Sequence, residues 1–148
     1  MSPARDRAWI AAHLPHRDGM CLLDEIVDWD GERLLARATS HTRADHPLRR
    51  RGLLPIAIAV EYGAQAVAAH GALVAGDSRA PAAGYLASVR NVVFHAERLD
   101  DIEGALEIRV EAEGSGRGGV VYGFSVSGAG RVLASGRVAI VLDAQATT

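Results

Sequence analysis

The sequence predicts an α+β domain in which an antiparallel sheet curls around one long buried helix. Residues 55–75 are apolar on nearly every side, a pattern typical of a helix that is covered all round. The second half of the chain changes to a period of two: in residues 105–113, charged positions alternate with Leu106, Ile108 and Val110. Two strands, one apolar helix and a run of further strands fit together most simply when the sheet wraps the helix.

Length and composition favour one domain that spans all 148 residues. The formal charge of −2 and the isoelectric point near 6.3 argue against general nucleic-acid binding. All sixteen basic residues are arginine. The one cysteine, Cys21, excludes an intrachain disulfide framework, and its apolar neighbours favour a buried thiol over a reactive one.

We also expect a cytoplasmic protein without a membrane span. A span needs about 20 apolar residues without charge. Residues 53–76 come nearest, but they contain Glu61, Gln65 and His70. The first residues lack the apolar core of a signal peptide.

The remaining elements follow from local patterns. A short amphipathic helix is expected at 5–13, and the Asp30-Gly31 pair predicts a hairpin between strands at 21–29 and 33–40. A linker at 81–84 is expected between the central helix and the rest of the sheet, and a turn at 114–119 is expected between two of the later strands. We expect its strands at residues 86–95, 105–113, 120–127 and 131–142.

An arginine-rich loop that contains His46 leads into the central helix. Pro55 suits the first turn of a helix. Glu61 is the first ionisable residue of that helix, and Gln65 follows four positions later on the same face. A carboxyl group on a buried helix either has a partner or retains its proton. This stretch is therefore the first candidate for chemistry.

The order of several motifs resembles the hot-dog fold (3R)-hydroxyacyl-acyl-carrier-protein dehydratases. Residues 14–17, Leu-Pro-His-Arg, and then 22–24, Leu-Leu-Asp, are similar to the opening motif of that family. The loop with His46, and Pro55 six residues before Glu61, are similar to its catalytic loop and helix. The resemblance covers about residues 14–142.

Within that superfamily, the sequence of these motifs is more similar to the dehydratase-like proteins of aryl polyene and related fatty-acid-like gene clusters. Asp45-His46-Pro47 and Glu61-Tyr62 carry this likeness. The common His-Phe-Pro-Gly is replaced by residues 46–49, His-Pro-Leu-Arg, and the glycine after the helix-starting proline by Ile56.

The resemblance implies dehydration of a 3-hydroxyacyl thioester to the trans-2-enoyl thioester. His46 is expected as the base and Glu61 as the acid, because a carboxyl group in apolar surroundings retains its proton more readily. Ile56 and Gln65 would border the substrate. We expect the unpaired backbone N–H groups near Ile56 to hold the thioester carbonyl, and Gln65 to orient Glu61 more readily than touch substrate. No metal and no cofactor are expected beyond the phosphopantetheine of the carrier protein.

In the resembled family, the histidine of one subunit meets the acid of the other. A homodimer, or a heterodimer with a second hot-dog subunit, is therefore implied. The acyl carrier protein is the expected partner, and Arg49, Arg50 and Arg51 would contact its acidic surface or its phosphate group. The alternative for these three arginines is a solvated loop.

Two other functions stay open. A hot-dog thioesterase would use the helix carboxylate with water, although the Leu-Pro-His-Arg motif and His46 favour a dehydratase. A catalytically silent subunit that completes an active dehydratase fits the altered His46 loop and Ile56.

Overall fold

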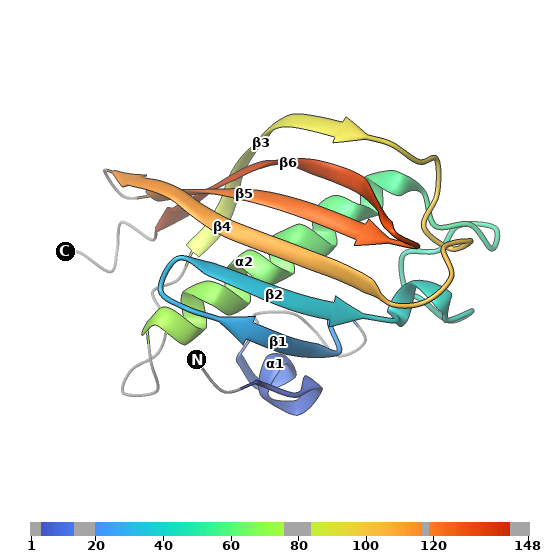
Figure 1. The fold of residues 1–148 in the computed structure, drawn as a ribbon, viewed down its shortest axis with the longest axis horizontal. Helices are drawn as coiled ribbons and strands as arrows, with labels where there is room; N and C mark the ends of the chain where they lie inside the picture. The colour runs from blue at the N-terminus through green and yellow to red at the C-terminus, as the bar shows by residue number, and fades with distance from the viewer. Residues whose placement is uncertain (1–3, 14–19, 76–83, 117–118, 143–148) are drawn as a thin grey trace.

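The computed structural model describes residues 4–13, 20–75, 84–116 and 119–142. Within them, six strands form one antiparallel sheet in the order β1-β2-β4-β5-β6-β3, and the sheet curls around the helix α2 (Figure 1). The elements are α1 (Arg7–His13), β1 (Glu25–Trp29), β2 (Arg33–Ala38), η1 (Ser40–Thr42), η2 (Ile56–Ile58), α2 (Ala59–Ala75), β3 (Gly84–Phe94), β4 (Leu106–Gly116), β5 (Gly119–Gly128) and β6 (Arg131–Leu142). This is the α+β hot-dog fold that the sequence predicts.

Several strand boundaries differ from the expectation, and two of the differences have a clear structural reason. The first strand begins at Glu25, not at Cys21, because the backbone of Leu22 bonds to side chains of Gln65 and Ser40 and not to the sheet. The turn expected at 114–119 is wrong in extent: β4 runs to Gly116 and β5 begins at Gly119, so cross-strand pairing continues through the glycines. The Leu-Pro-His-Arg motif at 14–17 and the linker at 81–83 lie outside the described residues.

The predicted central helix is present and begins with one 3-10 turn, η2. Its middle packs tightly on the sheet at Gly63, where an added Cβ would lie 2.7 Å from Cδ2 of Phe124. Near its end, the buried His70 donates from Nε2 to the carbonyl of Asp30 at 2.8 Å. Its Nδ1 atom accepts a hydrogen bond of 2.8 Å from the Tyr122 hydroxyl. The close packing of Gly63 on Phe124 and the buried hydrogen bonds of His70 thus fix the helix against the sheet.

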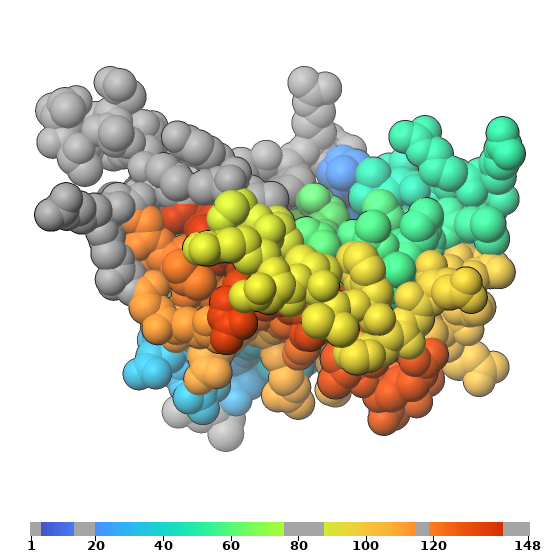
Figure 2. Space-filling model, turned by 90° about the horizontal axis from the view of Figure 1, so that it is seen from above, coloured from blue at the N-terminus to red at the C-terminus, as the bar shows by residue number. Residues whose placement is uncertain are grey.

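The two edges of the sheet differ. Backbone hydrogen bonds between Arg5 and Ile26 cover part of the β1 edge. At the other edge, β3 pairs only with β6 among the described strands, and Val93 and Phe94 on it are 48% and 44% exposed. Figure 2 shows β3, in yellow, at the surface. An unpaired edge with exposed apolar side chains is suited to pairing with another chain.

Neither helix in the described ranges combines the length and hydropathy that crossing a membrane would require.

Candidate functional site

The loop that carries His46 is folded around the guanidinium group of Arg49. Its nitrogens donate to three backbone carbonyls, those of Arg43 at 2.7 Å, Gly52 at 2.6 Å and His41 at 3.0 Å. A two-residue hairpin follows, in which Arg51 and Gly52 have φ angles of 53° and 80°. Because a guanidinium remains charged, its three hydrogen bonds hold the loop in one shape.

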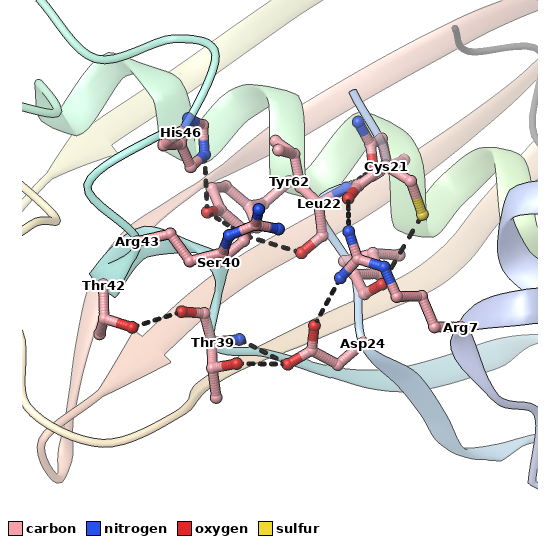
Figure 3. Close-up of polar contacts among 12 residues, drawn as sticks. Arg7, Cys21, Leu22, Asp24, Thr39, Ser40, Thr42, Arg43, His46 and Tyr62 are labelled. Atoms are coloured by element: carbon pink, nitrogen blue, oxygen red, sulfur yellow. Dashed lines mark hydrogen bonds and ion pairs between the residues drawn. The ribbon is translucent and has the colours of Figure 1, made fainter. Parts of the chain in front are cut away.

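His46 is buried under this loop, with 5% of its surface exposed. Its Nδ1 atom accepts the N–H of Leu48 at 3.0 Å, and its Nε2 atom lies 3.2 Å from the hydroxyl of Tyr62 (Figure 3). The Tyr62 hydroxyl lies 2.7 Å from that of Ser40, which donates to the carbonyl of Leu22 at 2.8 Å. The side chain of His46 is therefore connected through Tyr62 to the interior of its own subunit.

The donor and acceptor in each of these hydrogen bonds follow from the two backbone groups at the ends of the series, the N–H of Leu48 and the carbonyl of Leu22. A backbone N–H can only donate and a carbonyl can only accept. Nδ1 of His46 therefore has no proton, and Nε2 donates to Tyr62, which donates to Ser40. Burial and, to a smaller extent, the cations Arg49 and Arg43 lower the pKa of His46. Burial likewise raises the pKa of Tyr62, to about 12. Both groups are neutral at neutral pH.

Glu61 is held by Gln65, which is completely buried. The amide oxygen of Gln65 accepts the N–H of Leu22 at 2.9 Å. Its amide nitrogen donates to the carbonyl of Met20 at 2.6 Å and to Oε2 of Glu61 at 3.1 Å. Gln65 thus uses both ends of its amide within the subunit, and the geometry gives it the role of orienting Glu61.

The expectation of an unpaired N–H at Ile56 is wrong. This N–H donates to the carbonyl of Glu97 at 3.0 Å. The reason is that the start of the helix is joined to a second loop: Pro55 forms an isolated bridge with Arg98, and the N–H of Leu54 donates to Asp100 at 2.8 Å. The N–H of Ile56 is therefore not available to hold the thioester carbonyl.

The three loop arginines differ in what they can offer to a carrier protein. The donors of Arg49 face carbonyls of the loop, whereas Arg50 and Arg51 are exposed. Contact with a carrier protein stays a prediction, and only Arg50 and Arg51 have exposed side chains for it.

The sequence reasoning missed Tyr62 and Ser40. A usable signal was present, because a tyrosine on an apolar helix generally needs a partner for its hydroxyl. His41 was also given no role. It is buried, and its Nε2 atom donates to the carbonyl of Ile102 at 3.0 Å.

His46 and Glu61 are held on different sides of α2. Glu61 and Tyr62, the partner of His46, are adjacent on the helix and therefore point about 100° apart. Neither His46 nor Glu61 lines the large surface hollow of 890 Å³, which lies over the outer face of the sheet near Arg109 and Arg137. The arrangement in one subunit thus presents two separate polar clusters, both connected to the backbone of Leu22. The described residues contain no group of three or more side chains suited to hold a metal ion.

Several solved structures have a similar shape. The ApeI:P dehydratase heterocomplex from Xenorhabdus doucetiae has a TM-score of 0.75 at 21% identity, with 93% of this chain and 92% of that chain covered. AziG from S. sahachiroi has a TM-score of 0.62 at 21% identity, over 81% and 90% of the two chains. A mutant thioesterase PA1618 from Pseudomonas aeruginosa has a TM-score of 0.67 at 19% identity, over 96% and 95%. At such identities these likenesses show the fold.

A search among curated proteins finds no match. The sequence itself matches the ApeP-like family, described as ApeP dehydratase, over residues 8–148. That match covers nearly the whole chain, including the His46 loop, α2 and all six strands. The chain therefore belongs to the ApeP-like dehydratase family.

Proposed function

We propose that this chain is a subunit of a dehydratase that removes water from a 3-hydroxyacyl group bound as a thioester to an acyl carrier protein. The product is the trans-2-enoyl thioester, in a pathway of the fatty-acid or aryl polyene kind. His46 and Glu61 are the proposed catalytic pair. The observation that carries the proposal is the carboxyl group of Glu61, held by a fully buried Gln65 on the central helix in a member of a dehydratase family.

The proposed site is completed by a second hot-dog subunit. In one subunit His46 and Glu61 belong to separate clusters, so the histidine of one subunit would meet the carboxyl group of the other. The exposed β3 edge with Val93 and Phe94 supports such pairing. A solved relative of this shape is a dehydratase heterocomplex, and we propose that this chain also pairs with a second hot-dog protein.

Arg50 and Arg51 are proposed to meet the carrier protein. They lie in the hairpin that leads into Pro55 and α2, so a carrier bound there would reach the start of the helix. The acyl group would remain on its phosphopantetheine, and no other cofactor is needed for elimination of water.

One assay tests this function. The purified chain, with and without a hot-dog partner encoded beside it, is incubated with a 3-hydroxyacyl carrier protein, and the acyl product is followed by mass spectrometry. Loss of the mass of one water supports the proposal. Release of free carrier thiol would instead identify a thioesterase, and an unchanged substrate in both mixtures would contradict dehydration.

A second candidate is a subunit that completes an active partner without a base of its own. The hydrogen bonds of His46 favour it, because a base needs a free lone pair and both ring nitrogens are engaged. In the same assay, this role predicts no dehydration by the chain alone, an active mixture, and no effect of His46 substitutions on that mixture.

A further inference from the structure

Two series of hydrogen bonds both reach the backbone of Leu22. They determine which nitrogen of His46 carries the proton, and they make Oε2 of Glu61 an acceptor. In the first, the N–H of Leu48 donates to Nδ1 of His46, and Nε2 then donates through Tyr62 and Ser40 to the carbonyl of Leu22. The hydroxyl of Ser40 donates its proton to the carbonyl of Leu22, and that of Tyr62 donates to Ser40, so neither can donate to His46. His46 thus presents an N–H and no free lone pair.

The second series holds the Glu61 carboxyl group through Gln65. The N–H of Leu22 can only donate, so the group of Gln65 that it meets is the amide oxygen. The amide nitrogen then faces the carbonyl of Met20 and Oε2 of Glu61. Because an amide nitrogen can only donate, Oε2 of Glu61 is the acceptor of this hydrogen bond.

We infer that the roles are the reverse of those expected from the sequence: the Glu61 carboxylate takes the C2 proton, and the Nε2–H group of His46 donates a hydrogen bond to the thioester oxygen. This inference rests on the proposed dehydratase function and assigns roles within it. The thioester oxygen replaces the Tyr62 hydroxyl as the acceptor of the Nε2–H group, while that hydroxyl keeps its hydrogen bond to Ser40.

The elimination balances with these two groups alone. Glu61 takes the C2 proton, and the electron pair of that C–H bond is delocalised onto the thioester oxygen. This pair then returns to form the C2–C3 double bond as the C3–O bond breaks. The hydroxide that leaves with the C3–O pair takes the same proton back from Glu61 and departs as water. The Glu61 carboxylate is regenerated, and the negative charge that passes through the thioester oxygen is stabilised by His46.

Two further observations support the assignment. The N–H of Ile56, among the groups expected to hold the thioester carbonyl, already donates to Glu97 and is not available for this role. A neutral imidazole is an effective electrophile toward a carbonyl oxygen, and the burial that lowers the pKa of His46 keeps it neutral.

The test compares His46→Gln with His46→Ala in the assembled dehydratase. A glutamine amide can donate a hydrogen bond but cannot act as a base at neutral pH. We expect His46→Ala to lower kcat/KM by about 10²–10³-fold, the usual effect of losing one such donor. His46→Gln should stay within about tenfold of the wild type. Equal losses in both variants, or full activity of His46→Ala, would overturn the inference. Failure of the wild-type chain to dehydrate at all would instead overturn the proposed function.

A measurement on the wild-type protein does not depend on the folding of variants. Nitrogen NMR of the histidine-labelled chain reports which ring nitrogen carries the proton, and the spectrum of His46→Gln identifies the His46 signal. We expect the proton on Nε2 at neutral pH. A proton on Nδ1, with Nε2 free to act as a base, would overturn the inference; if His46→Gln does not fold, contact of the signal with Tyr62 protons identifies His46.

Discussion

Nε2 of His46 lies 3.2 Å from the hydroxyl of Tyr62, sixteen positions further along the chain, and this contact joins the arginine-rich loop to the buried helix. It is part of a series in which each donor has an acceptor. Buried series of this kind stabilise a fold only while every member is satisfied.

Tyr62→Phe should therefore destabilise the protein. The substitution leaves the Nε2–H of His46 without its acceptor in a buried position, which costs about 1–3 kcal/mol of unfolding free energy. Urea denaturation of the variant measures this loss. Because Ser40→Ala interrupts the same series, the double variant should lose less than the sum of the two single losses. Strictly additive losses would show that the series is not coupled.

Two glycines of α2 provide a matched pair. Gly63→Ala would place a Cβ 2.7 Å and 2.9 Å from ring atoms of Phe124, so we expect a loss of about 1–3 kcal/mol. Gly71 is exposed on the same helix with nothing within 4 Å of an added Cβ. Gly71→Ala should therefore gain about 0.5–1 kcal/mol from helix propensity. Chemical denaturation measures the unfolding free energy of both variants. Equal changes in the two would contradict this packing.

Substitutions of the loop arginines should have different effects on stability and on carrier binding. Arg49→Ala removes three hydrogen bonds to backbone carbonyls, and we expect it to cost about 2–3 kcal/mol of unfolding free energy. Arg50→Ala should change stability by less than about 0.5 kcal/mol, because its side chain is exposed.

Carrier affinity should show the opposite pattern. The double variant Arg50→Ala with Arg51→Ala should bind an acyl carrier protein several-fold more weakly, with a smaller dependence on salt. Titration calorimetry at two salt concentrations measures both quantities. Arg109→Ala, at an exposed position on the outer face of the sheet, is the control and should bind as the wild type does. Identical affinity of all variants for the carrier protein would show that this loop does not contact it.

Stability should fall when the pH is lowered from 7.5 to 5.5. Burial lowers the pKa of His41, His46 and His70 in the folded protein. Below the ordinary histidine value of about 6.5, the unfolded chain therefore binds more protons than the folded one, and unfolding is favoured. The loss is at most about 1.4 kcal/mol per pH unit for each histidine, and it ends below the folded pKa values.

Denaturation at several pH values checks this sign. His70→Gln should have a shallower pH dependence, because one of the three buried imidazoles is absent. Greater stability at pH 5.5 than at pH 7.5 would contradict the neutral, buried state of these histidines.

The sequence was sufficient for the order of elements because its periodicities are clear. The alternation around Ile108 predicts β4, and the apolar residues after Pro55 predict α2. It misplaced the turn at 114–119, because glycine and serine are typical of turns but here pair across the strands. Local composition does not encode such tertiary pairing.

The sequence predicts the helical spacing of Glu61 and Gln65, but not the part that Tyr62 and Ser40 take in the site or the hydrogen bonds between these residues. Glu61 and Gln65 lie one helical turn apart, as their spacing predicts, and Gln65 donates a hydrogen bond to Glu61. The pairing of His46 with Tyr62 and of Ile56 with Glu97 depends on where two distant loops fold, and neither spacing nor composition specifies that.

The most direct test of the account is the rate of dehydration by Glu61→Gln in the assembled enzyme. The amide retains the shape and a hydrogen-bonding oxygen but cannot exchange a proton with the substrate. We expect kcat/KM to fall by at least about 10²-fold, while Glu107→Gln, at an exposed position of β4, remains at the wild-type value. Wild-type activity of Glu61→Gln would contradict the central claim that the carboxyl group on α2 performs the proton transfer.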